Sequence, residues 1–254
     1  MVTAKNKFTM AASPFRLWLD LARAGNFPSV WSNVITALIL SGAGAEVQLH
    51  LGSPFWAVCW TLLAGSLAYA GGTTLNDVFD AGFDRNHRPE RAIPSGRISR
   101  STAGWVGGLQ LASGLGILIW LGASPTAAAG LAATILGYNW LHKRWTGSVL
   151  LMAGCRVMLA VTIATLPGYT FQPIFVVWIT VLFVYIVVLS LLARREYLPG
   201  APAEKLGRLV RKMLAFIPFV DTGALIFIGA WIPALATALS VPLGKWAQRQ
   251  AASG

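Results

Sequence analysis

Long uncharged stretches alternate with short basic clusters along the chain, and this pattern constrains the fold more than any other feature. From Ser101 to Leu141 the chain carries no charged residue, which is enough for two helices of the roughly 20 apolar residues that cross a bilayer. Only 11% of the 254 residues are charged, and the mean hydropathy is +0.62. Because soluble domains carry about a quarter charged residues, this composition excludes a soluble enzyme, a disordered chain and a disulfide-stapled secreted domain.

Glycine and proline signals divide the uncharged stretches into about eight spans. Breaks fall at Gly122–Pro125, Leu166–Gly168 and Gly229–Pro233. The sequence therefore predicts an all-α, polytopic membrane bundle of about eight transmembrane helices. We expect residues 1–25 to form an N-terminal interfacial amphipathic segment and residues 26–250 to form a single transmembrane domain.

The basic residues gather on one side of the predicted bundle. With a cytoplasmic N-terminus, every one of the 20 Lys and Arg residues except Arg156 falls before the first span, in an even-numbered loop or after the last span. The positive-inside rule then predicts a multi-pass protein of the lipid bilayer (the cytoplasmic membrane in a bacterium), with both termini and the active-site loops in the cytoplasm. The net charge of +11 is thus a topology signal, and no nucleic acid partner is expected.

An acidic cluster at the end of the second span is the most informative segment. Asn76, Asp80 and Asp84 recur every fourth residue and Asp77 lies three before Asp80, so the four side chains share one broad face of a helix. Three carboxylates crowded at a membrane boundary repel one another and are costly to desolvate. Mg²⁺ relieves both costs, since it prefers oxygen ligands and completes its shell with water and substrate phosphates. We therefore predict a magnesium site here; the alternative is a solvated acidic helix end.

A basic, turn-rich loop at residues 85–99 follows the acidic cluster. Arginine forks suit phosphate oxygens, so metal and arginine together indicate a grip on a diphosphate. The chemistry would then be ionisation of a C–O bond, with the leaving diphosphate stabilised by the metal and the cations. Taken alone, the loop is equally explained as a topology signal.

The segment NDVFDAGFDRNHRPERAIPSGRIS resembles the first aspartate-rich motif and the following loop of the UbiA-type intramembrane prenyltransferases. The resemblance implies a helical bundle around a central cavity that opens sideways to lipid. It also implies a Mg²⁺-dependent transfer of an isoprenoid chain from a prenyl diphosphate to an acceptor.

The resemblance also assigns roles to residues of this segment. Asn76, Asp80 and Asp84 would bind metal and diphosphate, with Asp80 and Asp84 as catalytic residues and Asp77 assisting. Arg91 and Arg97 would order the loop or contact the diphosphate.

The segment Tyr138–Arg144 resembles the family's tyrosine-to-lysine motif after the fourth span, although its spacing is one residue longer. The resemblance implies that Lys143 contacts diphosphate as a catalytic residue, with Arg144 beside it and Tyr138 at the cavity. The alternative is that Lys143 and Arg144 only anchor the span.

The clearest departure from the family pattern lies after the sixth span. Where the family has a second acidic motif, this chain has Arg194, Arg195 and Glu196. Arg195 is predicted to replace a second metal as a diphosphate partner, and Glu196 remains a candidate near the acceptor; alternatively the site is degenerate. The segments Met152–Arg156 and Ser190–Glu196 are similar to the divergent UbiA-like proteins of the Ebo gene clusters.

Two charged residues, Arg156 and Asp221, fall inside predicted spans, where charges are costly and favour a functional role. Arg156 is a candidate contact for the diphosphate or the acceptor, and Asp221 is a candidate ion-pair partner or a base near the acceptor. Asn33 is a candidate polar residue of the cavity. A buried pair that locks the bundle is the alternative for the two charges.

Two other functions remain open. A UbiA-type terpene cyclase, in which the prenyl chain's own double bond attacks the cation, is compatible with the altered second motif. A non-catalytic membrane carrier is disfavoured because the acidic and phosphate-fitting residues lie on one side of the membrane. The acceptor and the prenyl chain length stay unassigned.

Overall fold

Prolines and capping serines set the start of most long helices. A proline occupies the first turn of α2 (Phe27–Ser41), α4 (Pro54–His87) and α6 (Pro125–Leu141), where its missing N–H leaves no partner unsatisfied. The side chains of Ser53 and Ser99 accept hydrogen bonds from backbone N–H groups in the first turns of α4 and α5 (Arg100–Trp120).

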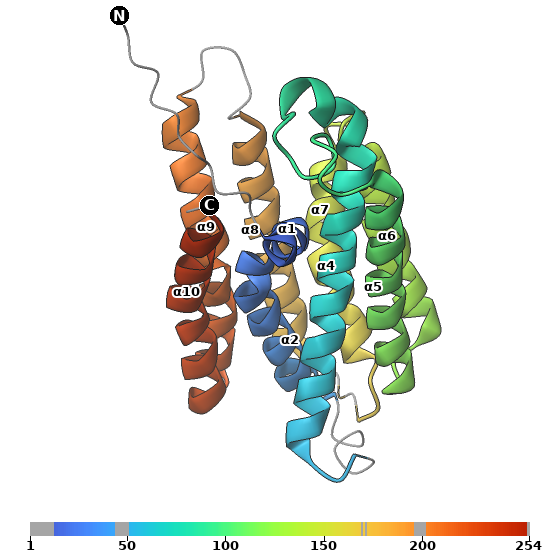
Figure 1. Ribbon diagram of the computed structural model, residues 1–254. Helices are drawn as coiled ribbons and strands as arrows, with labels where there is room; N and C mark the ends of the chain where they lie inside the picture. The colour runs from blue at the N-terminus through green and yellow to red at the C-terminus, as the bar shows by residue number, and fades with distance from the viewer. Residues whose placement is uncertain (1–12, 44–50, 169, 171, 196–201, 253–254) are drawn as a thin grey trace, which may run out of the picture.

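A computed structural model describes residues 13–43, 51–168, 170, 172–195 and 202–252 of the chain. Within these ranges the regular structure is entirely helical (Figure 1). The remaining elements are α1 (Pro14–Leu21), the short 3₁₀ helix η1 (Ala24–Asn26), α7 (Ser148–Ala164), α8 (Pro173–Arg195), α9 (Ala203–Phe227) and α10 (Trp231–Ala252). The eight helices α2 and α4 to α10 confirm the all-α bundle and match the eight predicted spans in number.

Three of these helices, α4, α5 and α8, are both long and apolar enough to cross a membrane, and α7 is a shorter apolar helix. Aliphatic and tryptophan side chains of the outer face are widely exposed, such as Trp105 at 81% and Ile232 at 85%. Exposed apolar surface of this extent indicates contact with lipid rather than with water.

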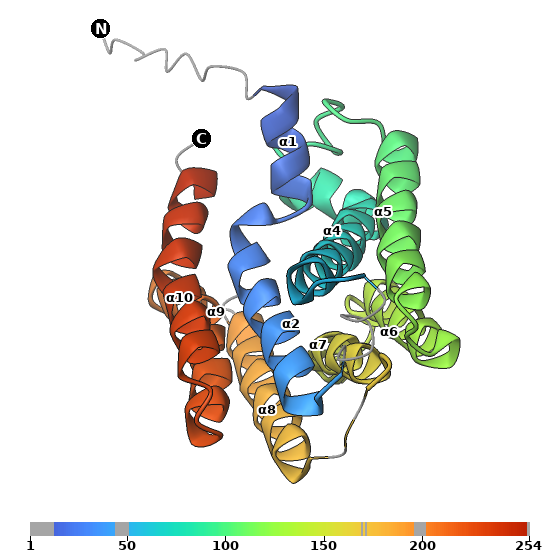
Figure 2. The same ribbon diagram turned by 90° about the horizontal axis from the view of Figure 1, so that it is seen from below.

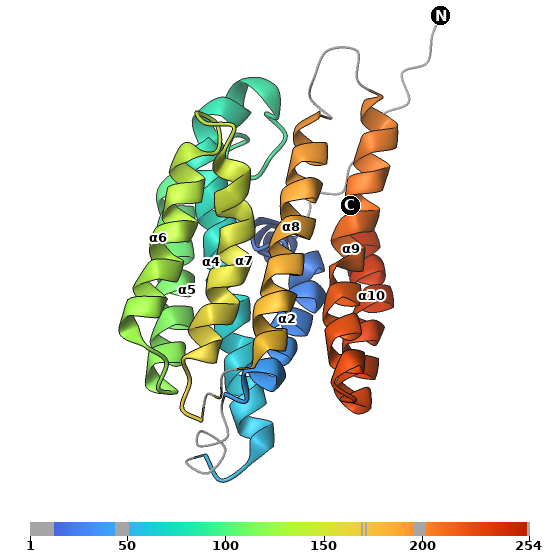
Figure 3. The same cartoon turned by 180° about the vertical axis from the view of Figure 1, so that it is seen from behind.

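Helix α2 lies at the centre of the bundle. It contacts α4, α7, α8, α9 and α10, and Figure 2 shows it between α4 and the α9–α10 pair. Its residues Val30, Val34, Ala37 and Leu40 are completely buried. From behind, α8 lies between α7 and α9 (Figure 3).

The N-terminal helix α1 packs on protein through its inward face. Leu17 and Leu21 are buried with Ala81 of α4 and with Ile93 and Ile98 of the loop that follows α4. This small second core holds the loop against the end of α4. The interfacial position expected for residues 1–25 stays a prediction, and residues 1–12 lie outside the described part.

Small residues let α4 and α5 approach closely. A Cβ added at Gly114 of α5 would lie 2.6 Å from the backbone nitrogen of Ala68 and 2.7 Å from the carbonyl oxygen of Ala64 on α4. Because both atoms belong to backbone, neither can move aside without shifting a helix.

We expect Gly114→Ala to destabilise the bundle by about 1–3 kcal/mol, the usual cost of overpacking, and to lower the temperature at which the detergent-purified protein loses its fold. Gly116→Ala is the matched control on the same helix, since an added Cβ there meets nothing within 4 Å. It should leave stability equal or slightly raised, because alanine favours helix over glycine. Equal losses for both variants would show that close packing at Gly114 is unimportant.

Candidate active site

The last turns of α4 bring the predicted acidic residues to one buried face. Asn76, Asp80 and Asp84 are only 7%, 5% and 2% exposed, and the Asp77 side chain is 15% exposed. A solvated acidic helix end therefore does not describe this face. Buried carboxylates require partners, and each of them has at least one cation.

Arg91, from the loop after α4, bridges two of the carboxylates. Its Nη1 lies 2.7 Å from Asp84 Oδ2 and 3.3 Å from Asp77 Oδ1. The turn that carries Arg91 is fixed by backbone hydrogen bonds. The Arg91 N–H donates to the carbonyl oxygen of Arg88, and the Ser95 N–H donates to the carbonyl oxygen of Arg91. The loop thus folds back over the acidic face that precedes it.

The residues that follow α6 bring a histidine and a lysine to Asp80. His142 Nε2 lies 3.0 Å from Asp80 Oδ1, and Lys143 Nζ lies 3.6 Å from Asp80 Oδ2. Lys143 also sits 4.1 Å from the centre of the Phe83 ring, a cation–π contact that steadies its ammonium group. His142 stacks on Tyr138 at 5.1 Å.

Arg23, between α1 and η1, approaches the same face from the N-terminal side. Its Nη2 donates to Asn76 Oδ1 at 3.2 Å and to Asp77 Oδ1 at 3.4 Å. Arg23 has φ 46° and ψ 47°, and it is the only non-glycine residue of the described part with a positive φ. A left-handed backbone conformation at a non-glycine residue is unfavourable. Arg23 adopts this conformation where its guanidinium contacts the acidic face.

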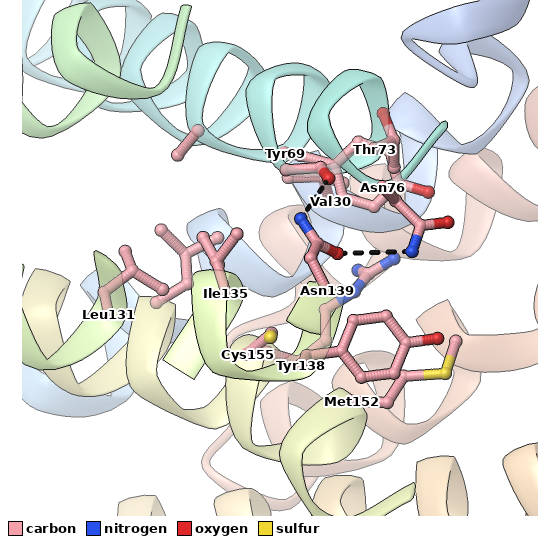
Figure 4. Close-up of a pocket in the computed structure, with 14 residues that line it drawn as sticks. Val30, Tyr69, Thr73, Asn76, Leu131, Ile135, Tyr138, Asn139, Met152 and Cys155 are labelled. Carbon is pink, nitrogen blue, oxygen red and sulfur yellow. Dashed lines mark hydrogen bonds between the residues drawn. The ribbon is translucent and has the colours of Figure 1, made fainter. Parts of the chain in front are cut away.

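A largely apolar cavity opens beside Asn76, between α2, α4, α6 and α7. Figure 4 shows Asn76 and Asn139 pointing toward one another, with Leu131 and Ile135 on the same side of the cavity as Asn139. Asn76 Nδ2 donates to Asn139 Oδ1 at 3.3 Å, and Asn139 Nδ2 donates to the carbonyl oxygen of Gly72 at 3.0 Å. The amide pair marks the point where the acidic face meets the cavity.

Arg156 of α7 is the one charged residue that lines this cavity in the described part of the chain. Its guanidinium donates to the backbone oxygen and the hydroxyl of Ser29, both at 2.9 Å, and to Asn33 Oδ1 at 2.5 Å. The guanidinium carbon lies 5.4 Å from the centre of the Tyr69 ring. These contacts hold the side chain in one orientation at the cavity wall.

Asp221 of α9 is completely buried on the far side of Asn33. Its carboxylate accepts hydrogen bonds from Asn33 Nδ2 at 3.0 and 2.8 Å, from Trp178 Nε1 at 2.8 Å and from the Ser32 hydroxyl. The direct Arg156–Asp221 ion pair considered from the sequence is absent from the described residues. Asn33 joins the two charges instead, with its oxygen toward the cation and its nitrogen toward the anion.

The other residues predicted for the site lie away from the acidic face or outside the residues that the structure describes. Arg97 donates to Ser95 Oγ at 2.9 Å and to the Glu90 carbonyl oxygen, which corresponds to the loop-ordering role. Arg144 lies over the Trp140 ring at 5.6 Å, and Arg195 is exposed at the end of α8. Glu196 lies outside the described residues, so its predicted role stays a prediction.

Three contact residues of the site were not predicted from the sequence: Arg23, Asn139 and His142. In the sequence Arg23 belongs to the polar face of the expected amphipathic segment and to the basic clusters, and the spacing of His50, His87 and His142 is not that of a metal site. The one available signal was the position of Asn139 and His142 inside the segment around Lys143.

The oxygen donors of Asn76, Asp77, Asp80 and Asp84 fit the ligand preference of Mg²⁺. Within the described residues, however, no three His, Cys, Asp or Glu side chains already form a cluster that could hold a metal. Arg91 and His142 hold the carboxylates instead. Binding a metal through three of these carboxylates would therefore require their present contacts to rearrange.

The chain has curated relatives that are named as a farnesyltransferase and as a phosphate synthase. It is 34% identical over 115 residues to the protoheme IX farnesyltransferase of Chloroflexus aurantiacus. This alignment covers 44% of this chain and 19% of that protein. It is 31% identical over 129 residues to the digeranylgeranylglyceryl phosphate synthase of Methanopyrus kandleri, covering 50% and 44%. The chain thus matches less than half the length of these curated relatives.

Solved structures support the fold. One of digeranylgeranylglyceryl phosphate synthase matches with a TM-score of 0.57 and 16% identity over 92% of this chain and 93% of the other. A UbiA homologue from Archaeoglobus fulgidus, bound to DMAPP and Mg²⁺, matches with a TM-score of 0.50 and 14% identity over 89% and 85%. At these identities the likeness concerns the fold.

The family model matches far more of the chain than either of the two curated relatives described above. It covers residues 33–251, a range that includes the acidic face, the loop with Arg91 and Asp221, and every residue that lines the cavity except Val30. The chain therefore belongs to the UbiA prenyltransferase family.

Proposed function

We propose that this protein transfers an isoprenoid chain from a prenyl diphosphate to an acceptor, with Mg²⁺ as cofactor. One observation carries the proposal: a buried acidic face, held by Arg23, Arg91 and Lys143 and contacted by His142, opens at Asn76 into an apolar cavity. A prenyl diphosphate has the same division, with a charged head and an apolar tail. The relatives' names and the DMAPP- and Mg²⁺-bound homologue support the same chemistry.

The protein is an integral membrane protein, as its apolar helices and its family indicate. We propose that both termini and the acidic face lie on the cytoplasmic side, because the basic clusters of the sequence adjoin that end of the bundle. A membrane-embedded site gives the isoprenoid tail direct access from lipid.

The acidic face would hold the metal and the diphosphate. Asn76, Asp77, Asp80 and Asp84 would provide oxygen ligands, and bound Mg²⁺ would neutralise charge on the leaving diphosphate. The freed guanidinium of Arg91 is placed to donate to diphosphate oxygens.

Cations at the margin would complete the diphosphate site. Lys143 would contribute a compact charge, and Arg23 would add a second fork from the N-terminal side. Arg97, Arg144 and Arg195 remain candidates for diphosphate binding. In the structure, however, Arg97 bonds to its own loop, Arg144 lies over the Trp140 ring and Arg195 is exposed.

The cavity would take the isoprenoid tail and the acceptor. Its apolar walls exclude water, which protects an allylic cation from hydrolysis. Arg156 and Tyr138 line this cavity and are candidates for acceptor contact. Asn33 and Asp221 would act behind Arg156 by holding it, and Glu196 remains a candidate at the acceptor.

The test is incubation of the detergent-purified protein with labelled C10, C15 and C20 prenyl diphosphates, with and without candidate acceptors. We expect Mg²⁺-dependent release of diphosphate that stops on addition of EDTA and returns with excess Mg²⁺. A prenylated acceptor supports transfer, whereas a cyclised hydrocarbon formed without acceptor would identify a terpene cyclase. Failure to release diphosphate from any of the three would contradict both enzymatic functions.

A further inference from the structure

A second, basic cleft lies between α9 and α10. Arg208, Arg211, Lys212 and Lys245 line it together with Ala215, Phe216 and Gln248. Four of these seven residues are cations, and none is acidic. In Figure 1 the α9–α10 pair forms one edge of the bundle, with α2 between it and α4, so this cleft is separate from the acidic face.

The charges of the cleft are largely uncompensated within the described residues. Glu204 pairs with Arg208 one helical turn away, and no other carboxylate of these residues lies within ion-pair distance of the four cations. Lys245 lies over the Phe216 ring, with its Nζ 4.4 Å from the ring centre, which fixes its ammonium group at the floor of the cleft. Like charges held together in this way repel one another, and a bound anion removes that cost.

Exposed apolar residues lie near the cleft residues along α9 and α10. Phe219 comes seven residues after Lys212 on α9 and is 50% exposed. On α10, Leu243 comes two residues before Lys245 and is 43% exposed, and Trp246, which directly follows Lys245, is 61% exposed. An exposed tryptophan next to a basic cluster is typical of the level of the lipid headgroups. A ligand for this place therefore combines a phosphate group with an apolar tail.

We propose that the α9–α10 cleft binds the phosphate group of an anionic phospholipid. Arginine and lysine side chains recognise phosphate oxygens, and basic pockets between membrane helices on the cytoplasmic side suit such headgroups. Free phosphate or diphosphate presents the same chemistry without a tail. The exposed Phe219 and Trp246, close to the cations along α9 and α10, favour the lipid.

The cleft is connected to the active-site cavity by hydrogen bonds. Gln248, which lines the cleft, donates from Nε2 to Asn26 Oδ1 at 3.0 Å. Asn26 donates from Nδ2 to the Tyr69 hydroxyl at 3.1 Å, and Tyr69 lines the cavity. A headgroup in the cleft would therefore lie two side-chain hydrogen bonds from the cavity wall.

Native mass spectrometry of the full chain, delipidated in neutral detergent, tests the proposal with phosphatidylglycerol and phosphatidylcholine as probes. We expect retention of phosphatidylglycerol over phosphatidylcholine, reduced at least about tenfold in Lys212→Gln/Lys245→Gln, since losing two charge-assisted contacts costs more than one tenfold step in affinity. The control Arg85→Gln/Lys205→Gln removes the same charge outside the cleft and should retain the lipid.

Three outcomes would overturn the proposal: equal retention of both lipids, unchanged retention in the cleft variant, or equal loss in the control. If millimolar phosphate or diphosphate displaces the lipid completely, the cleft is a site for free phosphate instead. Should the double variant elute as aggregate, Lys245→Gln alone serves, and the wild-type complex should weaken as salt screens the charges.

Discussion

Asp84→Asn is expected to reduce diphosphate release by at least about a hundredfold, the usual scale for loss of one electrostatic group that stabilises a transition state. The substitution keeps the side chain's shape but removes the charge that both Arg91 and a metal require. Since the Asp84 side chain is 3% exposed, water cannot supply a substitute ligand. The measurement is initial-rate release of labelled diphosphate at saturating Mg²⁺.

Glu204→Gln is the control for Asp84→Asn, because it removes a carboxylate that is 84% exposed and paired only with Arg208 one turn away. It should leave the rate unchanged, and Asp80→Asn should behave like Asp84→Asn. Near-normal turnover in Asp84→Asn, in protein that elutes as folded, would remove the metal-binding assignment of this face.

Asp221→Ala should destabilise the bundle by about 3–5 kcal/mol, the cost of breaking a buried charged network by removing one partner. The change leaves Trp178 Nε1 and the Ser32 hydroxyl without their acceptor. It also removes the one carboxylate that the described residues place in the network of Arg156. Thermal unfolding of the detergent-purified protein measures the loss. Asp221→Asn should lose less, because an amide oxygen still accepts one or two of the hydrogen bonds.

The same pair of variants separates a structural from a catalytic role for Asp221. A structural role predicts that activity falls only as far as the folded fraction falls. If Asp221→Asn unfolds at the wild-type temperature and yet loses transfer to the acceptor while retaining diphosphate release, Asp221 acts on the acceptor side instead.

The spans and the acidic face could be predicted because their signals are local. Apolar runs broken by glycine and proline identify helices. The four-residue spacing of Asn76, Asp80 and Asp84 places them on one face of a helix whatever surrounds that helix. The confirmed UbiA resemblance rests on the same contiguous segment.

The partners of that face could not be predicted, because they depend on how distant helices align. Asn139 lies 63 residues from Asn76 and Arg23 lies 53 residues from it along the chain. Whether such residues meet depends on the relative height and rotation of helices, which no local pattern specifies. For the same reason the sequence showed two buried charges but not that Asn33 would separate them.

The Asn33 network also has a consequence for the order in which the chain enters the membrane. Synthesis delivers Ser29, Ser32 and Asn33 first, then Arg156, then Trp178 and finally Asp221. An unpaired charge is costly in the bilayer. Each span that carries a charge is therefore synthesised after the polar groups that can form hydrogen bonds with that charge. The last hairpin, which carries a carboxylate in its first helix, depends on the earlier spans for its insertion, so the bundle is assembled around its first long helix.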